Sequence, residues 1–186
     1  MVAGEACGKV ILFGEHFVVH GSPAIAAGIS NSCIVDVKKS IENAFVGPKG
    51  TSEELSKKSI SNILNAMKIK QNYTVTYGGD LPIFGGLGSS AAFCVAIVRA
   101  LAKEHKLRLT NEQINDYAYE GEKAFHGNPS GIDNTMATYG GVMLYTRGKT
   151  LEESKFEPIK FTTKLHIVLG VTGVFGPTSE IGRAHV

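Results

Sequence analysis

Residues 85–92 read Gly-Gly-Leu-Gly-Ser-Ser-Ala-Ala, and these residue types are suited to holding an anion. Glycine adopts backbone conformations that a side chain forbids, and it lets another molecule approach the main chain closely. Ser89 and Ser90 stand where an apolar helical run begins, so they can cap that helix or present hydroxyls outward. A helix start has unpaired N–H groups and partial positive charge, which favour phosphate. The segment predicts a phosphate-binding loop, with a capped helix after a flexible turn as the alternative.

The loop is not a Walker A sequence, because Ser89 follows its last glycine where that motif has lysine. Backbone N–H groups and serine hydroxyls would have to hold the phosphates, with Mg²⁺ and a lysine supplied from elsewhere. Lys9, which precedes an apolar strand, is a candidate for that lysine. The alternative for Lys9 is a solvated flank, since most lysines are exposed.

Residues 120–134, EGEKAFHGNPSGIDN, form a second segment rich in functional residue types. Glu122 lies near a helix end, where a carboxylate opposes the helix dipole and can serve a cation instead. Asp133 ends a turn-forming run, and a rigid loop that presents its carboxylate would suit a general base, with an Asx-turn residue as the alternative. Phosphoryl transfer needs a phosphate cradle, a Mg²⁺ ligand, a base and a cation, roles that Ser90, Glu122, Asp133 and Lys9 would fill. These residues indicate a nucleotide-dependent transferase.

The elements that must position these residues follow from hydrophobic periodicity. Strands and helices are mixed without regular βαβ alternation, which favours an α+β fold. The expected strands are 9–13, 33–39, 72–77, 140–146 and 165–171, and the expected helices are 52–67, 89–105 and 111–125. The pairs Thr51–Glu54 and Thr110–Gln113 have the spacing of capping boxes.

Composition excludes several classes of function. The 186 residues are 43% hydrophobic and 19% charged, with a net charge of +2 and three widely spaced cysteines. Nothing in this pattern indicates a nucleic-acid surface, a membrane span, a disulfide framework or a thiolate metal site. His16 and His20 lack the helical HExxH order, so zinc is not expected. We expect a cytoplasmic protein.

Three segments carry a resemblance to a known family. The stretches GKVILFGEHFVVHG (8–21), GGLGSSAA (85–92) and HGNPSGIDN (126–134) resemble the signature regions of the mevalonate kinases, within the GHMP kinase superfamily. The resemblance extends over residues 8–178. It implies an N-terminal ATP-binding domain like domain 2 of ribosomal protein S5, with the family's ferredoxin-like C-terminal domain missing. It also implies transfer of the γ-phosphoryl group of ATP to the 5-hydroxyl of mevalonate, an early step towards isoprenoids.

The resemblance also implies roles for individual residues. Asp133 matches the proposed catalytic base, and Lys9 matches the lysine that stabilises the developing charge. Ser90 and Glu122 match Mg²⁺ ligands. The residues matching positions at the ATP phosphates are Lys9, Gly85, Gly86, Leu87, Gly88, Ser89 and Ser90. Those matching positions near the mevalonate site are Glu15 and His16. A homodimer is a further expectation for the intact enzyme.

Two positions depart from the family pattern: Cys7 replaces a usual proline, and Phe84 replaces a small residue. The interpretation assigns residues 1–179 to the ATP-binding domain. It treats residues 180–186 as a non-native tail, because EIGRAHV continues no pattern and fits a translated sequencing adapter. On this interpretation the chain as written lacks one wall of the active site and is expected to be inactive. The alternatives are another GHMP small-molecule kinase, such as a phosphomevalonate or sugar kinase, and a nucleotide-binding chain without catalysis.

Overall fold

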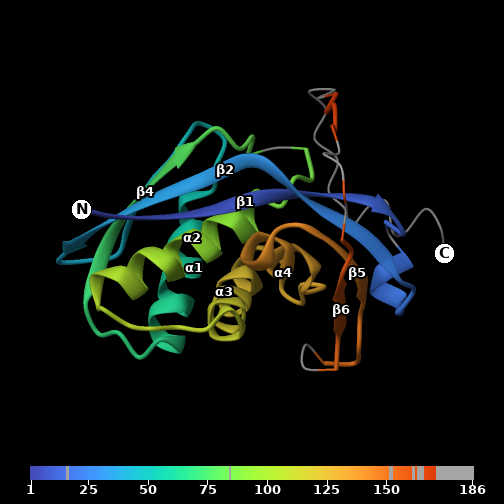
Figure 1. Cartoon of the computed structure of the whole chain (residues 1–186). Coiled ribbons are helices and arrows are strands. Elements are labelled where there is room, and N and C mark those ends of the chain that lie inside the picture. Colours follow the sequence, from blue (N-terminus) through green and yellow to red (C-terminus); the bar gives the residue numbers. More distant parts are fainter. Residues whose placement is uncertain (16, 84, 151–152, 161, 163–165, 171–186) are drawn as a thin grey trace.

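The structure is a computed structural model, and it describes residues 1–15, 17–83, 85–150, 153–160, 162 and 166–170. Its described strands form one sheet. Strands β1 and β2 make a long ribbon in this sheet, and the helices gather on one side of that ribbon (Figure 1). In chain order the elements are β1 (Val2–Phe13), the 3₁₀ turn η1 (Phe17–His20), β2 (Ala24–Ser40), β3 (Ala44–Val46), α1 (Glu53–Ala66), β4 (Asn72–Gly79), α2 (Ser89–Glu104), α3 (Asn111–His126), α4 (Ile132–Tyr139), β5 (Val142–Thr146) and β6 (Lys155–Pro158).

The strand β2 organises the sheet because it has different partners along its length. On one edge it pairs antiparallel with β1, from Val2 opposite Val37 to Phe13 opposite Ile25. On the other edge its residues 24–27 pair with β5 and its residues 33–40 pair with β4, both antiparallel. The sheet order is β3-β4-β2-β5-β6, with β3 parallel to β4. The expected α+β fold is confirmed.

The core lies between the sheet and α2, which is apolar on nearly every side. Residues 91–98 of α2 are all buried. A helix that is apolar all round has to be covered by other elements on each side. The Phe93 ring packs edge-on against Phe45 and Phe125 at centroid distances of 5.4 and 6.4 Å. A smaller cluster, which includes Val18, Ile132, Met136, Met143 and Tyr145, joins α4 to β5.

Two strands are longer than the sequence predicts, and several short elements are additional to the predicted ones. Strands β1 and β2 begin at Val2 and Ala24, well before the predicted Lys9 and Cys33. Their early segments are rich in alanine and glycine, which have weak strand preference, so long-range pairing decides their structure. The short elements β3, α4 and β6 were not predicted. The predicted strand 165–171 is not seen in its described part, since residues 166–170 have no regular structure.

The two predicted capping boxes had different outcomes. At α3 the box is confirmed: the Thr110 hydroxyl accepts from the Gln113 N–H, and the Gln113 side chain accepts from the Thr110 N–H. At α1 the predicted Thr51–Glu54 box is wrong. Ser52 is the N-cap there, accepting from the Leu55 N–H, while the Thr51 hydroxyl donates to the Pro48 carbonyl. Two adjacent hydroxyl residues both suited the pattern, and only the backbone geometry distinguishes them.

Gly8 shows how the sheet admits the glycine-rich segment. A Cβ at this position would lie 2.4 Å from Leu81 Cδ1 and 3.0 Å from the Leu87 carbonyl oxygen. The missing side chain therefore lets Leu81 and Leu87 lie directly against β1. The pairing register of β1 with β2 also shifts between Cys7 and Lys9. Such irregularities re-aim side chains, and here the change falls beside Lys9.

Candidate active site

Lys9 on β1 is the centre of the candidate site. Its side chain is buried, and its Nζ lies 3.2 Å from Asp133 Oδ1 and donates to the Gly86 carbonyl at 2.9 Å. Its backbone N–H donates to the Leu87 carbonyl at 2.9 Å. A buried ammonium needs such partners, because burying an unpaired charge is costly. The structure thus brings Lys9, Asp133 and the glycine-rich loop together, as the sequence predicted, and excludes a solvated flank for Lys9.

Asp133 lies in the first turn of α4, not on the loop where the sequence analysis placed it. The helix begins after Gly131, whose φ of 84° is in the left-handed region. A carboxylate at a helix N-terminus is stabilised by the helix dipole. The Asp133 side chain is 29% exposed, so it faces solvent while it contacts Lys9. This position is suited to receiving a proton from a bound hydroxyl.

A buried polar cluster fixes α4 against α3 behind Asp133. The Asn134 side-chain amide donates to Asn115 Oδ1 at 2.7 Å, and the Asn115 amide donates to Thr135 Oγ1 at 3.3 Å. All three side chains are buried. Because buried hydrogen bonds are costly to break, this cluster holds the two helices, and therefore Asp133 and Glu122, in a fixed relation.

The glycine-rich loop leads directly into α2. Gly85, Gly86 and Gly88 have φ values of 103°, 72° and 70°. Gly88 is the N-cap and offers no side-chain acceptor to the first N–H groups of α2. The Ser89 hydroxyl donates to the Ile83 carbonyl at 3.0 Å, so it stabilises the loop. A Cβ on Gly85 or Gly86 would meet nothing within 4 Å, which leaves open space beside this part of the loop.

Glu122 on α3 is a buried carboxyl group beside the start of α2. Its side chain is 1% exposed, and burial together with the nearby Asp133 carboxylate raises its pKa to about 8. Oε1 lies 3.9 Å from the Cys94 thiol, and Oε2 lies 3.8 Å from His126 Nε2. The Ser90 hydroxyl lies 3.2 Å from the same His126 nitrogen. Glu122 and Ser90 therefore belong to one small cluster.

This cluster fits the chemistry of a hard divalent cation. Ser90 and Glu122 offer oxygen ligands, and the buried carboxyl would be favoured in its charged form by a cation. Within the described ranges no group of three or more His, Cys, Asp and Glu residues is arranged to hold a metal ion alone. Magnesium usually takes one or two protein ligands together with substrate phosphates, so two ligands would be sufficient for it.

The structure describes only some of the remaining positions that the sequence singled out. Glu15 is exposed just after β1, and His16 lies outside the described residues, as does Phe84. Cys7 is partly buried, with its thiol 3.6 Å from the Met136 carbonyl oxygen. Residues 180–186 also lie outside the described part of the chain.

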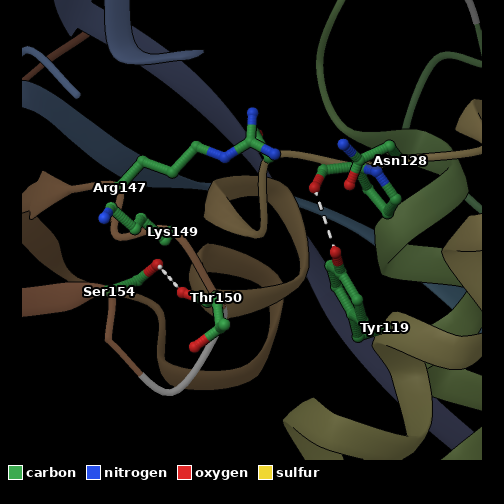
Figure 2. A pocket seen from close by; sticks show the side chains of 8 residues that line it. Tyr119, Asn128, Arg147, Lys149, Thr150 and Ser154 are labelled. Atoms are coloured by element: carbon green, nitrogen blue, oxygen red, sulfur yellow. Dashed lines mark hydrogen bonds between the residues drawn. The ribbon is translucent and has the colours of Figure 1, made fainter. Parts of the chain in front are cut away.

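The structure adds a small polar pocket that the sequence analysis missed. Its volume is about 70 Å³, and Arg147 extends across it toward the side of Asn128 (Figure 2). Lys149 adds a second positive charge. Tyr145 links this pocket to the turn that precedes α4, because its hydroxyl donates to the Ser130 carbonyl at 2.7 Å. The remaining lining residues are Tyr119, Pro129, Ser130, Thr150 and Ser154. No recognised motif surrounds Arg147, so only the fold reveals it.

A second cavity of about 460 Å³ opens between the end of β4 and the glycine-rich loop. Its lining is largely apolar, with Pro48, Tyr77, Leu81, Pro82 and Ile83 among its residues. The two cavities therefore differ in character, one cationic and one apolar, and both lie beside segments of the candidate site.

Comparison with known proteins agrees with this geometry. Residues 54–141 match the family described as "GHMP kinases N terminal domain". The curated mevalonate kinases of Thermococcus gammatolerans and Pyrococcus furiosus are 34% and 35% identical over 97% of this chain and 60% of their own length. The crystal structure of L. major mevalonate kinase in complex with R-mevalonate is 36% identical, with a TM-score of 0.84 over 98% of this chain and 60% of that one. The chain thus spans about three fifths of these relatives.

The fold and the matched residues together define the class: this chain carries, over residues 54–141, the N-terminal domain of the GHMP kinase superfamily. Within that superfamily it is a homologue of the mevalonate kinases, which it matches along almost its whole length. No helix in the described part of the chain is long and apolar enough to cross a membrane.

Proposed function

We propose that this chain forms the nucleotide- and mevalonate-binding part of a mevalonate kinase, which transfers the γ-phosphoryl group of ATP to the 5-hydroxyl of mevalonate. The observation that carries the proposal is the contact of buried Lys9 with both Asp133 and the glycine-rich loop. In this contact the proposed base and a cation lie next to the proposed phosphate-binding segment, which supports the proposal. The identity to mevalonate kinases over 97% of the chain supports the choice of substrate.

In the proposed reaction the mevalonate oxygen O5 forms a bond to the γ-phosphorus, and the bond from that phosphorus to the β–γ bridging oxygen breaks. ADP leaves with the electron pair. The O5 proton passes to an Asp133 carboxylate oxygen, which is a general-base role. Lys9 stabilises the negative charge that develops on O5 and the phosphoryl oxygens. Its contact with Asp133 also keeps that carboxylate oriented.

The glycine-rich loop and the first turn of α2 would bind the ATP phosphates through backbone N–H groups. The apolar cavity beside the loop has room for the base of the nucleotide. Ser90 and Glu122 would hold Mg²⁺, which when bound neutralises phosphate charge and orients the γ-phosphoryl group. Arg147, in the polar pocket, would bind the mevalonate carboxylate, since a guanidinium matches a carboxylate in charge and geometry.

The test is an assay of ADP release with mevalonate, in a protein in which residues 1–170 replace the matching part of the Pyrococcus furiosus relative. This design supplies the part of the relative that the chain does not span. We expect ADP release that depends on mevalonate. Activity with phosphomevalonate or a sugar, and none with mevalonate, would favour another GHMP kinase. Nucleotide binding without any turnover would favour a non-catalytic role. The cytoplasmic location and the homodimer stay predictions.

A further inference from the structure

His126 lies where α3 ends and contacts both proposed cation ligands with one atom. Its Nε2 is 3.2 Å from the Ser90 hydroxyl oxygen and 3.8 Å from Glu122 Oε2. Glu122 precedes it by four residues, so the two side chains share one face of α3. Ser90 is the second residue of α2. The imidazole therefore connects the end of one helix with the beginning of another.

The Ser90 hydroxyl has one hydrogen and two neighbouring acceptors. Either the Glu122 carboxylate or His126 Nε2 can accept it, and Nε2 lies 3.2 Å from the hydroxyl oxygen. When Ser90 and Glu122 both direct oxygen lone pairs at one cation, the hydrogen can no longer lie between them. It must then point to another acceptor, and His126 Nε2 is already within hydrogen-bond distance.

We infer that His126 is a positioning residue that accepts the Ser90 hydroxyl hydrogen and so turns the oxygen lone pairs of Ser90 toward the cation. This role rests on the proposed function, because it assigns Mg²⁺ to Ser90 and Glu122. It requires the tautomer whose hydrogen is on Nδ1, leaving Nε2 as the acceptor. The His126 side chain is 52% exposed, so Nδ1–H can donate to solvent. Partners that orient metal ligands in this way typically affect metal affinity by about 10–100-fold.

The experiment measures binding of the non-hydrolysable nucleotide AMP-PNP to the full chain by calorimetry, once with excess Mg²⁺ and once with EDTA. His126→Leu removes the acceptor. His126→Gln keeps a carbonyl oxygen at about the same distance from the backbone. His105→Gln is the matched control, because His105 is also an exposed histidine at a helix C-terminus and its Nε2 is 2.8 Å from the Tyr73 hydroxyl.

We expect His126→Leu to weaken binding by about 10-fold or more with Mg²⁺ and by less than twofold with EDTA. His126→Gln should restore most of the Mg²⁺-dependent affinity, and His105→Gln should change neither value. Equal weakening with Mg²⁺ and EDTA would overturn the inference and indicate a structural role. So would a His126→Gln variant that is as weak as His126→Leu.

Two further variants separate this inference from the proposed function. Ser90→Ala and Glu122→Gln should each remove most of the difference between the Mg²⁺ and EDTA measurements. If they do and His126→Leu does not, the positioning role is wrong and the cation site stands. If neither variant alters the difference, or if the unaltered chain binds no AMP-PNP, the proposed function itself fails and the inference fails with it.

Discussion

Lys9 is buried in this fold because two separate segments compensate its charge. The Asp133 carboxylate and the Gly86 carbonyl both lie within hydrogen-bonding or ion-pair distance of its Nζ. Removing either partner would leave the ammonium partly unsatisfied. The same contacts make Lys9 and Asp133 a coupled unit at the proposed reaction centre. A substitution at Asp133 therefore tests catalysis and the local electrostatics together.

We expect Asp133→Asn to lower kcat by about 10²–10⁴-fold in the hybrid enzyme, which is the protein proposed above with residues 1–170 of this chain and the remainder of the Pyrococcus furiosus relative. The reason is that the amide cannot accept the hydroxyl proton. The measurement is steady-state ADP release at saturating ATP and mevalonate. Asp36→Asn is the control, since Asp36 pairs with Ala3 at the opposite end of the β1–β2 ribbon. A kcat within a few-fold of the parent would show that Asp133 is not the base.

At Arg147 we expect the Arg147→Met variant to raise KM for mevalonate about 10-fold or more, with a smaller change in kcat. The reason is the loss of a charge-assisted hydrogen bond to the substrate carboxylate, which contributes about 1.5–3 kcal/mol. Kinetics against mevalonate concentration measure this, with the exposed Arg108→Met as control. An unchanged KM would mean that the carboxylate binds elsewhere.

At the scale of elements, the site depends on how α2, α3 and α4 begin and end. Ser90 lies at the start of α2, Asp133 at the start of α4 and Glu122 near the end of α3. The buried pair Asn115–Asn134 joins α3 to α4. Because helix ends are where unpaired backbone groups and dipole charge lie, these ends concentrate the binding chemistry. The capping of a helix end can be tested directly by substitution of the cap residue.

For α1 we expect Ser52→Ala to lower the free energy of unfolding by about 1 kcal/mol, because Ser52 accepts from the Leu55 N–H as the N-cap. Thr51→Ala, one residue earlier, should cost less than about 0.5 kcal/mol, because Thr51 is partly exposed, lies outside the helix and does not cap it. Urea unfolding followed by circular dichroism measures both. The reverse order of costs would restore Thr51 as the cap.

At the scale of the whole molecule, β2 joins the two halves of the sheet. It pairs with β5 at one end and with β4 at the other, and the candidate site lies where it changes partner, since Lys9 stands opposite Gly28. Cys33 lies just beyond this point, completely buried in the main core. The ionisation of the Cys33 thiol therefore depends on whether this core is folded.

We expect the free energy of unfolding to fall as pH rises from about 9 to about 12. Burial raises the pKa of the Cys33 thiol from 9.0 to about 12, so the folded chain keeps a proton that the unfolded chain loses. Each such group contributes a slope of up to about 1.4 kcal/mol per pH unit. Guanidinium unfolding of the parent and of Cys33→Ala at several pH values measures it. The variant should show a shallower slope, and identical slopes would contradict this account.

Local patterns in the sequence determined much of this protein. The apolar run after Ser90, the turn-rich segment before Asp133 and the Thr110–Gln113 cap are short-range features, and each folds as its residues predict. The α+β class and the main helices follow from the same periodicity. These features depend on neighbours a few residues apart, which is why the sequence alone was sufficient for them.

The tertiary structure decided which residues meet. Asp133 occupies a helix turn, not a loop, because Ile132 and Met136 of α4 are buried in one cluster with residues of β2 and β5. Residues 24–32 become strand only through pairing with β1 and β5, since alanine and glycine have little strand preference of their own. Arg147 and His126 acquire their places from contacts that cross between elements. Such contacts join residues far apart in the chain, and no local pattern records them.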